Sequence, residues 1–106
     1  MGFREKDYLI QRLEEAARAV ARILGFKDAG KPDEARAELE RSARSLIGVG
    51  MDPLGRVDVG TAVGLLRSRL AVECYAQLLD AQAELEDPER AEALRARAKA
   101  IRDQGQ

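Results

Sequence analysis

The sequence predicts an all-α protein, and three observations lead to this class. Alanine and leucine dominate the apolar residues, arginine and glutamate dominate the charged ones, and all four are strong helix formers. Apolar residues recur at helical spacing, and no segment alternates over the length of a strand. Capping residues precede several of these segments and glycines follow them. We therefore expect two antiparallel helical hairpins, tetratricopeptide-like or bundle-like, with one short extra helix.

The first hairpin is predicted from a helix over 7–24 and a helix over 32–47. Gly25 suits the C′ position of the first helix. Pro32 suits the N1 position of the second, where its missing N–H costs nothing. Gly48 suits the end of the second helix. A connection this short requires the two helices to pack antiparallel.

The middle of the chain is rich in glycine, and we predict a loop over 48–57 followed by a short helix over 58–67 with Asp58 as its cap. This region carries unusually many apolar side chains for such a composition: Val49, Met51, Leu54, Val57 and Val59. The loop either folds back on the core as a lid, which we favour, or forms part of a contact surface.

The second hairpin is predicted from a helix over 68–86 and a helix over 88–103. Asp87 suits the N-cap of the latter, and Pro88 suits its N1 position. The 68–86 helix has only a narrow polar arc, formed by Arg69, Glu73, Gln77, Asp80 and Glu84. A helix that is apolar around most of its circumference is buried on two sides. We therefore expect it to be the central element.

The chain has 106 residues, which predicts a single helical domain over 1–106, with residues 1–6 and 104–106 frayed. Helical spacing and hydropathy assign the core to the following side chains: Leu9, Leu13, Val20, Ile23, Leu24, Leu39, Leu46, Leu70, Cys74, Leu78 and Leu94.

Surplus apolar surface is the best candidate for a binding site. The 68–86 helix carries more apolar surface than one neighbouring hairpin covers. We expect seven residues of this helix and of the 48–57 loop to contact a partner: Val72, Tyr75, Ala76, Leu79, Ala83, Met51 and Leu54. The partner would be another protein, or a second copy of the chain in a homodimer.

Catalytic and metal chemistry find little support in the composition. The chain has no histidine and one cysteine, so it lacks the commonest general base and the commonest zinc-ligand spacings. We predict no catalytic residue, no metal-binding or cofactor-binding residue, no cofactor and no small-molecule substrate. Cys74 lies on an apolar helix face and is interpreted as a core residue. The alternative is a thiol-based enzyme or redox sensor that uses Cys74.

Nucleic-acid binding is a second alternative. The C-terminal helix carries five basic residues: Arg90, Arg95, Arg97, Lys99 and Arg102. Acidic residues accompany them, and the whole chain has a net charge of −1, so a one-sided basic field is not predicted. No apolar run approaches the roughly 20 residues of a membrane span, and the single cysteine suits the cytoplasm.

Two resemblances accompany this interpretation. The turn Gly30-Lys31-Pro32-Asp33-Glu34-Ala35 resembles the start of the second helix in tetratricopeptide repeats, although their first-helix pattern is missing. Asp7-Tyr8-Leu9, followed by Ile23-Leu24-Gly25 and Leu46-Ile47-Gly48, resembles a family of small uncharacterised bacterial helical proteins with a tetratricopeptide-like hairpin character. That resemblance implies the fold and transfers no activity.

The sequence thus predicts a small cytoplasmic, non-catalytic interaction or adaptor module, which binds through a helical groove or through the face formed by the last two helices.

Overall fold

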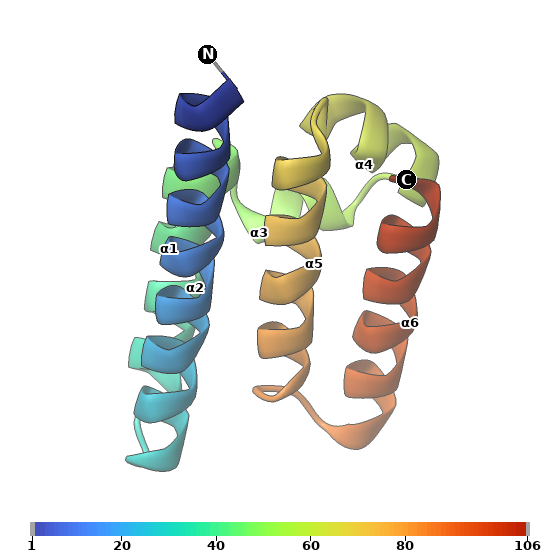
Figure 1. The fold of residues 1–106 in the computed structure, drawn as a ribbon. Helices are drawn as coiled ribbons and strands as arrows, with labels where there is room; N and C mark the ends of the chain where they lie inside the picture. Colours follow the sequence, from blue (N-terminus) through green and yellow to red (C-terminus); the bar gives the residue numbers. More distant parts are fainter. Residues whose placement is uncertain (1, 106) are drawn as a thin grey trace.

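The computed structural model describes the backbone of residues 2–105 and the side chains of residues 7–105. This part of the chain is helical and contains no strand, so the predicted all-α class is confirmed (Figure 1). The helices in chain order are α1 (Gly2–Asp28), α2 (Pro32–Ile47), α3 (Met51–Gly55), α4 (Val59–Leu66), α5 (Arg69–Ala83) and α6 (Pro88–Gln104).

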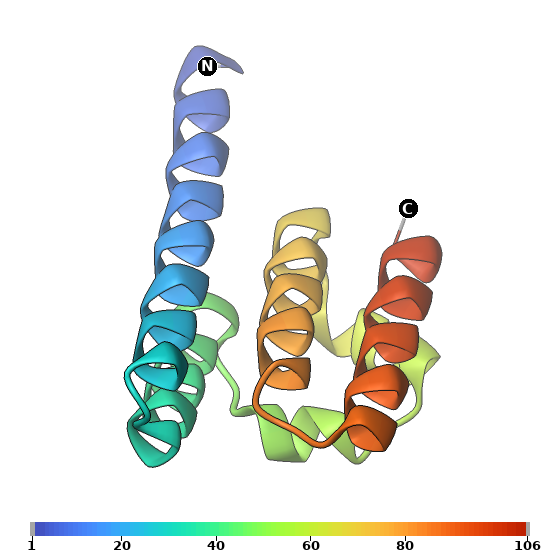
Figure 2. The ribbon, with the colours of Figure 1, turned by 90° about the horizontal axis from the view of Figure 1, so that it is seen from below.

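Helix α5 is the centre of the arrangement, as the sequence predicted. Helices α1 and α2 form one antiparallel pair and contact one side of α5, while α6 runs antiparallel to α5 on the other side (Figures 1 and 2). The short helix α4 contacts α6 and α5 near the C-terminus, and α3 contacts α2. Both α2 and α6 begin with proline at the predicted position.

Helix α1 is longer than predicted at both ends. It begins at Gly2 rather than at residue 7, and its first turns project beyond the rest of the molecule (Figure 2). Its other end passes through Gly25, because Phe26 packs against the core and burial of this side chain offsets the roughly 1 kcal/mol cost of a helical glycine. The turn glycine is instead Gly30, at φ +74°. The fraying expected for residues 1–6 and 104–106 stays a prediction, and residues 1 and 106 lie outside the described part of the chain.

The segment predicted as a loop over 48–57 contains the helix α3, which the glycines and Pro53 concealed. Met51 and Leu54 are one helical turn apart, and only 3% and 2% of their surfaces are exposed. Val49, Val57 and Val59 are half-buried against the same core. The segment therefore covers the core as a lid, the alternative that we favoured.

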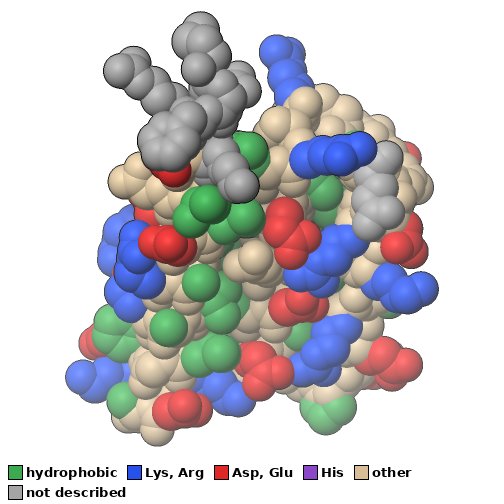
Figure 3. All heavy atoms as spheres, in the orientation of Figure 1, with side chains coloured by type: hydrophobic (Ala, Val, Ile, Leu, Met, Phe, Trp, Pro, Cys, Tyr) green, Lys and Arg blue, Asp and Glu red, His purple; other side chains and the backbone are tan. Residues whose placement is uncertain are grey.

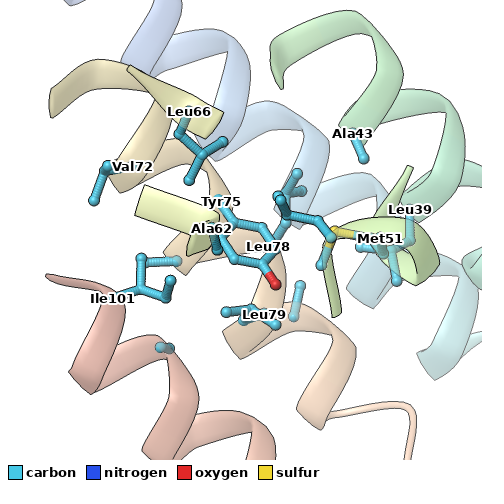
Figure 4. Close-up of a cluster of buried hydrophobic side chains, with 14 of the residues drawn as sticks. Leu39, Ala43, Met51, Ala62, Leu66, Val72, Tyr75, Leu78, Leu79 and Ile101 are labelled. Carbon is cyan, nitrogen blue, oxygen red and sulfur yellow. The ribbon is translucent and has the colours of Figure 1, made fainter. Parts of the chain in front are cut away.

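The core lies around α5 (Figure 4). Five predicted core residues are buried: Ile23, Leu39, Leu46, Cys74 and Leu78. Four others are half-buried: Val20, Leu24, Leu70 and Leu94. The prediction is wrong for Leu9 and Leu13, whose side chains are 44% and 37% exposed. They lie on a face of α1 that no other described helix covers.

Asp58, Ser68 and Asp87 occupy N-cap positions, and the last two form conventional side-chain caps. The Ser68 hydroxyl accepts a hydrogen bond from the backbone N–H of Ala71, and the Asp87 carboxylate accepts one from Arg90. Asp58 occupies the N-cap position of α4 as predicted, but its carboxylate accepts a hydrogen bond from the Thr61 hydroxyl and not from a backbone N–H.

Arg97 fastens the lid to the second hairpin. Its guanidinium donates from Nη2 to the Leu54 carbonyl oxygen (2.8 Å) and from Nε to the Tyr75 hydroxyl (3.1 Å). Tyr75 is completely buried, so this arginine supplies the partner that a buried hydroxyl requires. One side chain of α6 thereby joins α3 and α5.

Replacing Arg97 with methionine should lower the free energy of unfolding by about 2 kcal/mol, because the Tyr75 hydroxyl and the Leu54 carbonyl oxygen lose their partner. Urea denaturation measures this change. The Tyr75→Phe variant is the control: it should cost about 1 kcal/mol in the wild-type chain and close to nothing in Arg97→Met. Strictly additive effects of the two substitutions would contradict a direct interaction.

Replacing Arg67 with glycine should stabilise the chain by about 1 kcal/mol. Arg67 ends α4 in the left-handed region at φ +68°, where a Cβ atom is unfavourable and glycine is not. Arg56 is the matched control, since it ends α3 in the right-handed helical region, where glycine brings only an entropic cost. A loss of stability in both variants, measured by urea denaturation, would contradict the role of backbone strain at residue 67.

Candidate functional site

The seven residues predicted to contact a partner do not form a surface. All of them are buried: Val72, Tyr75, Ala76, Leu79, Ala83, Met51 and Leu54. The prediction of a contact surface here is therefore wrong, because α6 and the lid cover the face of α5 that was expected to remain free. Val72, for example, lies under the C-terminal end of α6, beside Gly105.

The open apolar surface lies on α1 instead. This helix carries two rows of apolar side chains. Ala16, Ala19 and Ile23 form the inner row, which is buried against α2 and α5. The second row alternates spacings of three and four residues and consists of Ile10, Leu13, Ala17, Val20 and Leu24. Its first three residues are exposed, while Val20 and Leu24 are half-buried and Val20 packs against the core. We call this second row the outer stripe.

The outer stripe has the spacing of a coiled-coil seam, in which a neighbouring helix would insert its own side chains. Ile10 is 46% exposed, Ala17 is exposed, and Val20 and Leu24 are half-buried. Leu9 lies beside the stripe and adds to the apolar area. The N-terminal half of the stripe therefore presents large side chains, and its middle presents a small one.

A groove of about 480 Å³ runs beside the C-terminal half of the outer stripe. Ala17, Val20 and Leu24 form its apolar wall. The opposite side comes from α5 and α6 and consists of Gln77, Asp80, Ala81, Glu84 and Arg95. Figure 3 shows hydrophobic side chains gathered along α1 and charged side chains over α5 and α6. We call this hollow the α1–α5 groove.

The charged groups at the polar side of the groove neutralise one another. The Glu84 carboxylate accepts hydrogen bonds from Arg95 and from Lys27 at 3.5 Å, and these two partners, Arg95 first, lower the pKa of Glu84 below its ordinary value. Arg102 pairs with Asp80 at 3.0 Å and with Glu73. Partial burial works against the charge of Arg102, but its hydrogen bonds to the two carboxylates raise its pKa. The apolar wall therefore faces a rim of paired charges.

Cys74 has the surroundings of a structural residue. Its side chain is buried with Ala16, Ala19 and Leu46. Burial raises the pKa of the thiol above its ordinary value, and the opposing effect of the Arg12 charge is smaller. A nucleophilic or redox-active thiol requires a shift in the other direction.

The basic residues of α6 are engaged within the protein. Four of them pair with carboxylates, in Arg90–Glu86, Arg95–Glu84, Lys99–Asp103 and the Arg102 pairs with Glu73 and Asp80. The fifth is Arg97, which holds the lid. A nucleic-acid surface needs cations that are free to meet phosphates, and this helix presents a mixed-charge surface.

The acidic turn between α5 and α6 is likewise accounted for by internal contacts. Glu84 binds Lys27 and Arg95, Glu86 pairs with Arg90, and Asp87 caps α6. Over the residues that the structure describes, no group of three or more histidine, cysteine, aspartate or glutamate side chains could hold a metal ion.

Two polar anchors between α1 and α2 escaped the sequence interpretation. Arg12 donates to the Leu46 carbonyl oxygen at 2.9 Å and to that of Ser45 at 3.2 Å, at the C-terminal end of α2. Glu38 is 95% buried and accepts hydrogen bonds from Arg22, Arg41 and Ser42. Arg12 lies one turn before Ala16, in line with the inner row of α1. A positively charged residue in line with a buried row was the sequence signal that could have revealed this anchor.

No family model, no curated protein and no solved structure matches this chain. No helix in the described residues is sufficiently long and apolar to span a bilayer. The site is therefore interpreted from its own geometry.

Cys74 should not react with a thiol reagent until the protein unfolds, because the sulfur is buried and burial favours the protonated form. The Ala37→Cys variant carries an exposed thiol for comparison and should react at once. Spectrophotometric titration under native and denaturing conditions measures both. Rapid native labelling of Cys74 in the wild-type chain would restore the thiol-enzyme alternative.

Proposed function

We propose that this chain is a small protein–protein interaction module that binds a helix along the outer stripe of α1. One observation carries the proposal: five apolar residues follow coiled-coil spacing along α1, of which Ile10, Leu13 and Ala17 are exposed and Val20 and Leu24 are half-buried. Soluble monomers scatter single apolar side chains over their surface, but they seldom leave a continuous row of them exposed. A row of this kind is typical of a helix that meets another helix.

The α1–α5 groove favours a helical partner over an extended peptide. Residues 2–105 contain no strand, so the described part of the chain offers no strand edge beside the stripe that a peptide could extend. Its apolar wall follows the axis of α1 and lies opposite a rim of paired charges, as in an interface with an apolar centre and a polar border. The proposal retains the adaptor function that the sequence predicts and moves it from α5 to α1.

The remaining predictions belong to the same proposal. A non-catalytic role agrees with the buried Cys74 and with the paired carboxylates, and the engaged cations of α6 argue against the nucleic-acid alternative. Two helical hairpins that leave a groove suit a tetratricopeptide-like character. A single buried thiol suits the reducing cytoplasm.

A photo-crosslinking amino acid in place of Ala17 tests the proposal in a lysate of the source organism. We expect a discrete cross-linked band that is lost in a Leu13→Glu background, because a charge on the stripe opposes burial of a partner helix. The same amino acid in place of Ala37 provides the control, since Ala37 is exposed on α2, away from the stripe. Identical patterns at both positions, or no band at position 17, would overturn the proposal.

A further inference from the structure

We infer that the helix seated on the outer stripe is α1 of a second copy, which runs antiparallel across a twofold axis near Ala17. This inference rests on the proposed function and names its partner. The sequence already suggested a homodimer, but through α5, whose apolar faces are buried in the structure. The surface argued for here is on α1.

The shape of the stripe is self-complementary under a twofold axis. Its N-terminal half presents the large exposed side chains Leu9, Ile10 and Leu13. Its C-terminal half borders the hollow of the α1–α5 groove. A twofold axis near Ala17 exchanges the two halves, so the large side chains of each copy lie over the groove of the other. Contacts of this reciprocal kind are what an isologous dimer requires.

The small residue at the centre allows the two helices to approach closely. Ala17 lies midway along the stripe and is exposed. At about 1.5 Å per residue, Ile10 and Leu24 lie roughly 10 Å on either side of it along the axis. Antiparallel pairing therefore brings Ile10 of each copy opposite Leu24 of the other, and Leu13 opposite Val20.

The charges beside the stripe select the antiparallel direction. Glu14 and Arg18 are exposed on the solvent-facing edge of α1, on either side of the proposed axis, and lie 3.8 Å apart within one chain. An antiparallel pair brings Glu14 of one copy near Arg18 of the other, twice per dimer. In a parallel pair Glu14 and Arg18 of one copy lie on the opposite flank of the seam from those of the other copy, so the ion pair between copies is not formed.

The projecting first turns of α1 lengthen the contact between the two copies. The first turns extend beyond the rest of the molecule (Figure 2). In the antiparallel dimer the region around Leu9 and Ile10 lies over the C-terminal half of the partner's α1. The dimer thus covers Leu9 and Ile10, two large apolar side chains that are exposed in the monomer.

Sedimentation equilibrium over a wide range of protein concentration is the first test. We expect a monomer of 11.7 kDa at low concentration and twice that mass at high concentration. Leu13→Glu should weaken the dimer about a hundredfold or more, since each dimer would lose two buried leucines. Leu65→Glu is the matched control, because Leu65 is a 60% exposed leucine on α4, away from α1, and should leave the dimer unchanged. Circular dichroism checks that both variants are folded.

Disulfide formation tests the direction of the pair. Ile10→Cys and Leu24→Cys chains should cross-link when they are mixed and oxidised, while each variant alone should not, because like positions lie about 21 Å apart in the antiparallel dimer. Cross-linking of Ile10→Cys with itself would overturn the antiparallel arrangement. The wild-type chain gives the background from Cys74.

Charge exchange provides a second criterion. Glu14→Arg should weaken the dimer about tenfold, and the double variant Glu14→Arg with Arg18→Glu should restore it. Equal dimer affinity in all three chains would overturn the charge pairing.

A chain that remains monomeric at every concentration overturns the dimer. Photo-crosslinking at position 17 then distinguishes failure of the dimer from failure of the proposed function. A cross-link to a different protein leaves the proposed function standing, whereas no cross-link removes both.

Discussion

Burial of α5 is the constraint on which the arrangement of the chain depends. Eight of its 15 residues are buried, and they point in several directions around the helix axis. No single neighbour can cover such a helix, so the α1–α2 pair takes one side, α6 takes another, and the lid and α4 close what remains. The polar arc then faces outward, where Glu73 and Asp80 share Arg102. The positions of α3 and α6 both follow from this demand, and Arg97 links them to Tyr75 of α5.

The helices that could be predicted are those whose signals are local. Pro32, Gly48, Asp87 and Pro88 act within one turn of the position that they mark, and the structure uses each as expected. The errors occur where a contact distant in sequence overrides a local preference. Phe26 draws α1 past a glycine because it can pack on the core, and residues 51–55 become helical because Met51 and Leu54 are buried together. Neither contact is visible from composition.

The candidate site could not be located for a related reason. The sequence shows that the chain has more apolar helix faces than four packed helices need, but it does not show which face remains free. The prediction placed the binding face on α5 because that helix is more apolar than α1. The same property causes α5 to be buried at the centre of the fold. The clue on α1 was the size of the side chains. Its buried row contains Ala16 and Ala19, while the outer stripe contains Ile10 and Leu13.

Helix α1 packs on α2 and α5 through its inner row and leaves the large side chains Ile10 and Leu13 exposed. Alanines on both helices, among them Ala16, Ala19, Ala35 and Ala43, are fully buried and permit close approach, but each contributes little hydrophobic free energy. The α1–α2 pair therefore relies on polar anchors as well. Arg12 holds the end of α2, and Glu38 binds Arg22 across the helices. The core takes up Ile23 and Phe26 of α1, while Ile10 and Leu13 remain exposed. The exposed Ile10 and Leu13 are therefore the part of α1 to which the proposed partner helix would bind.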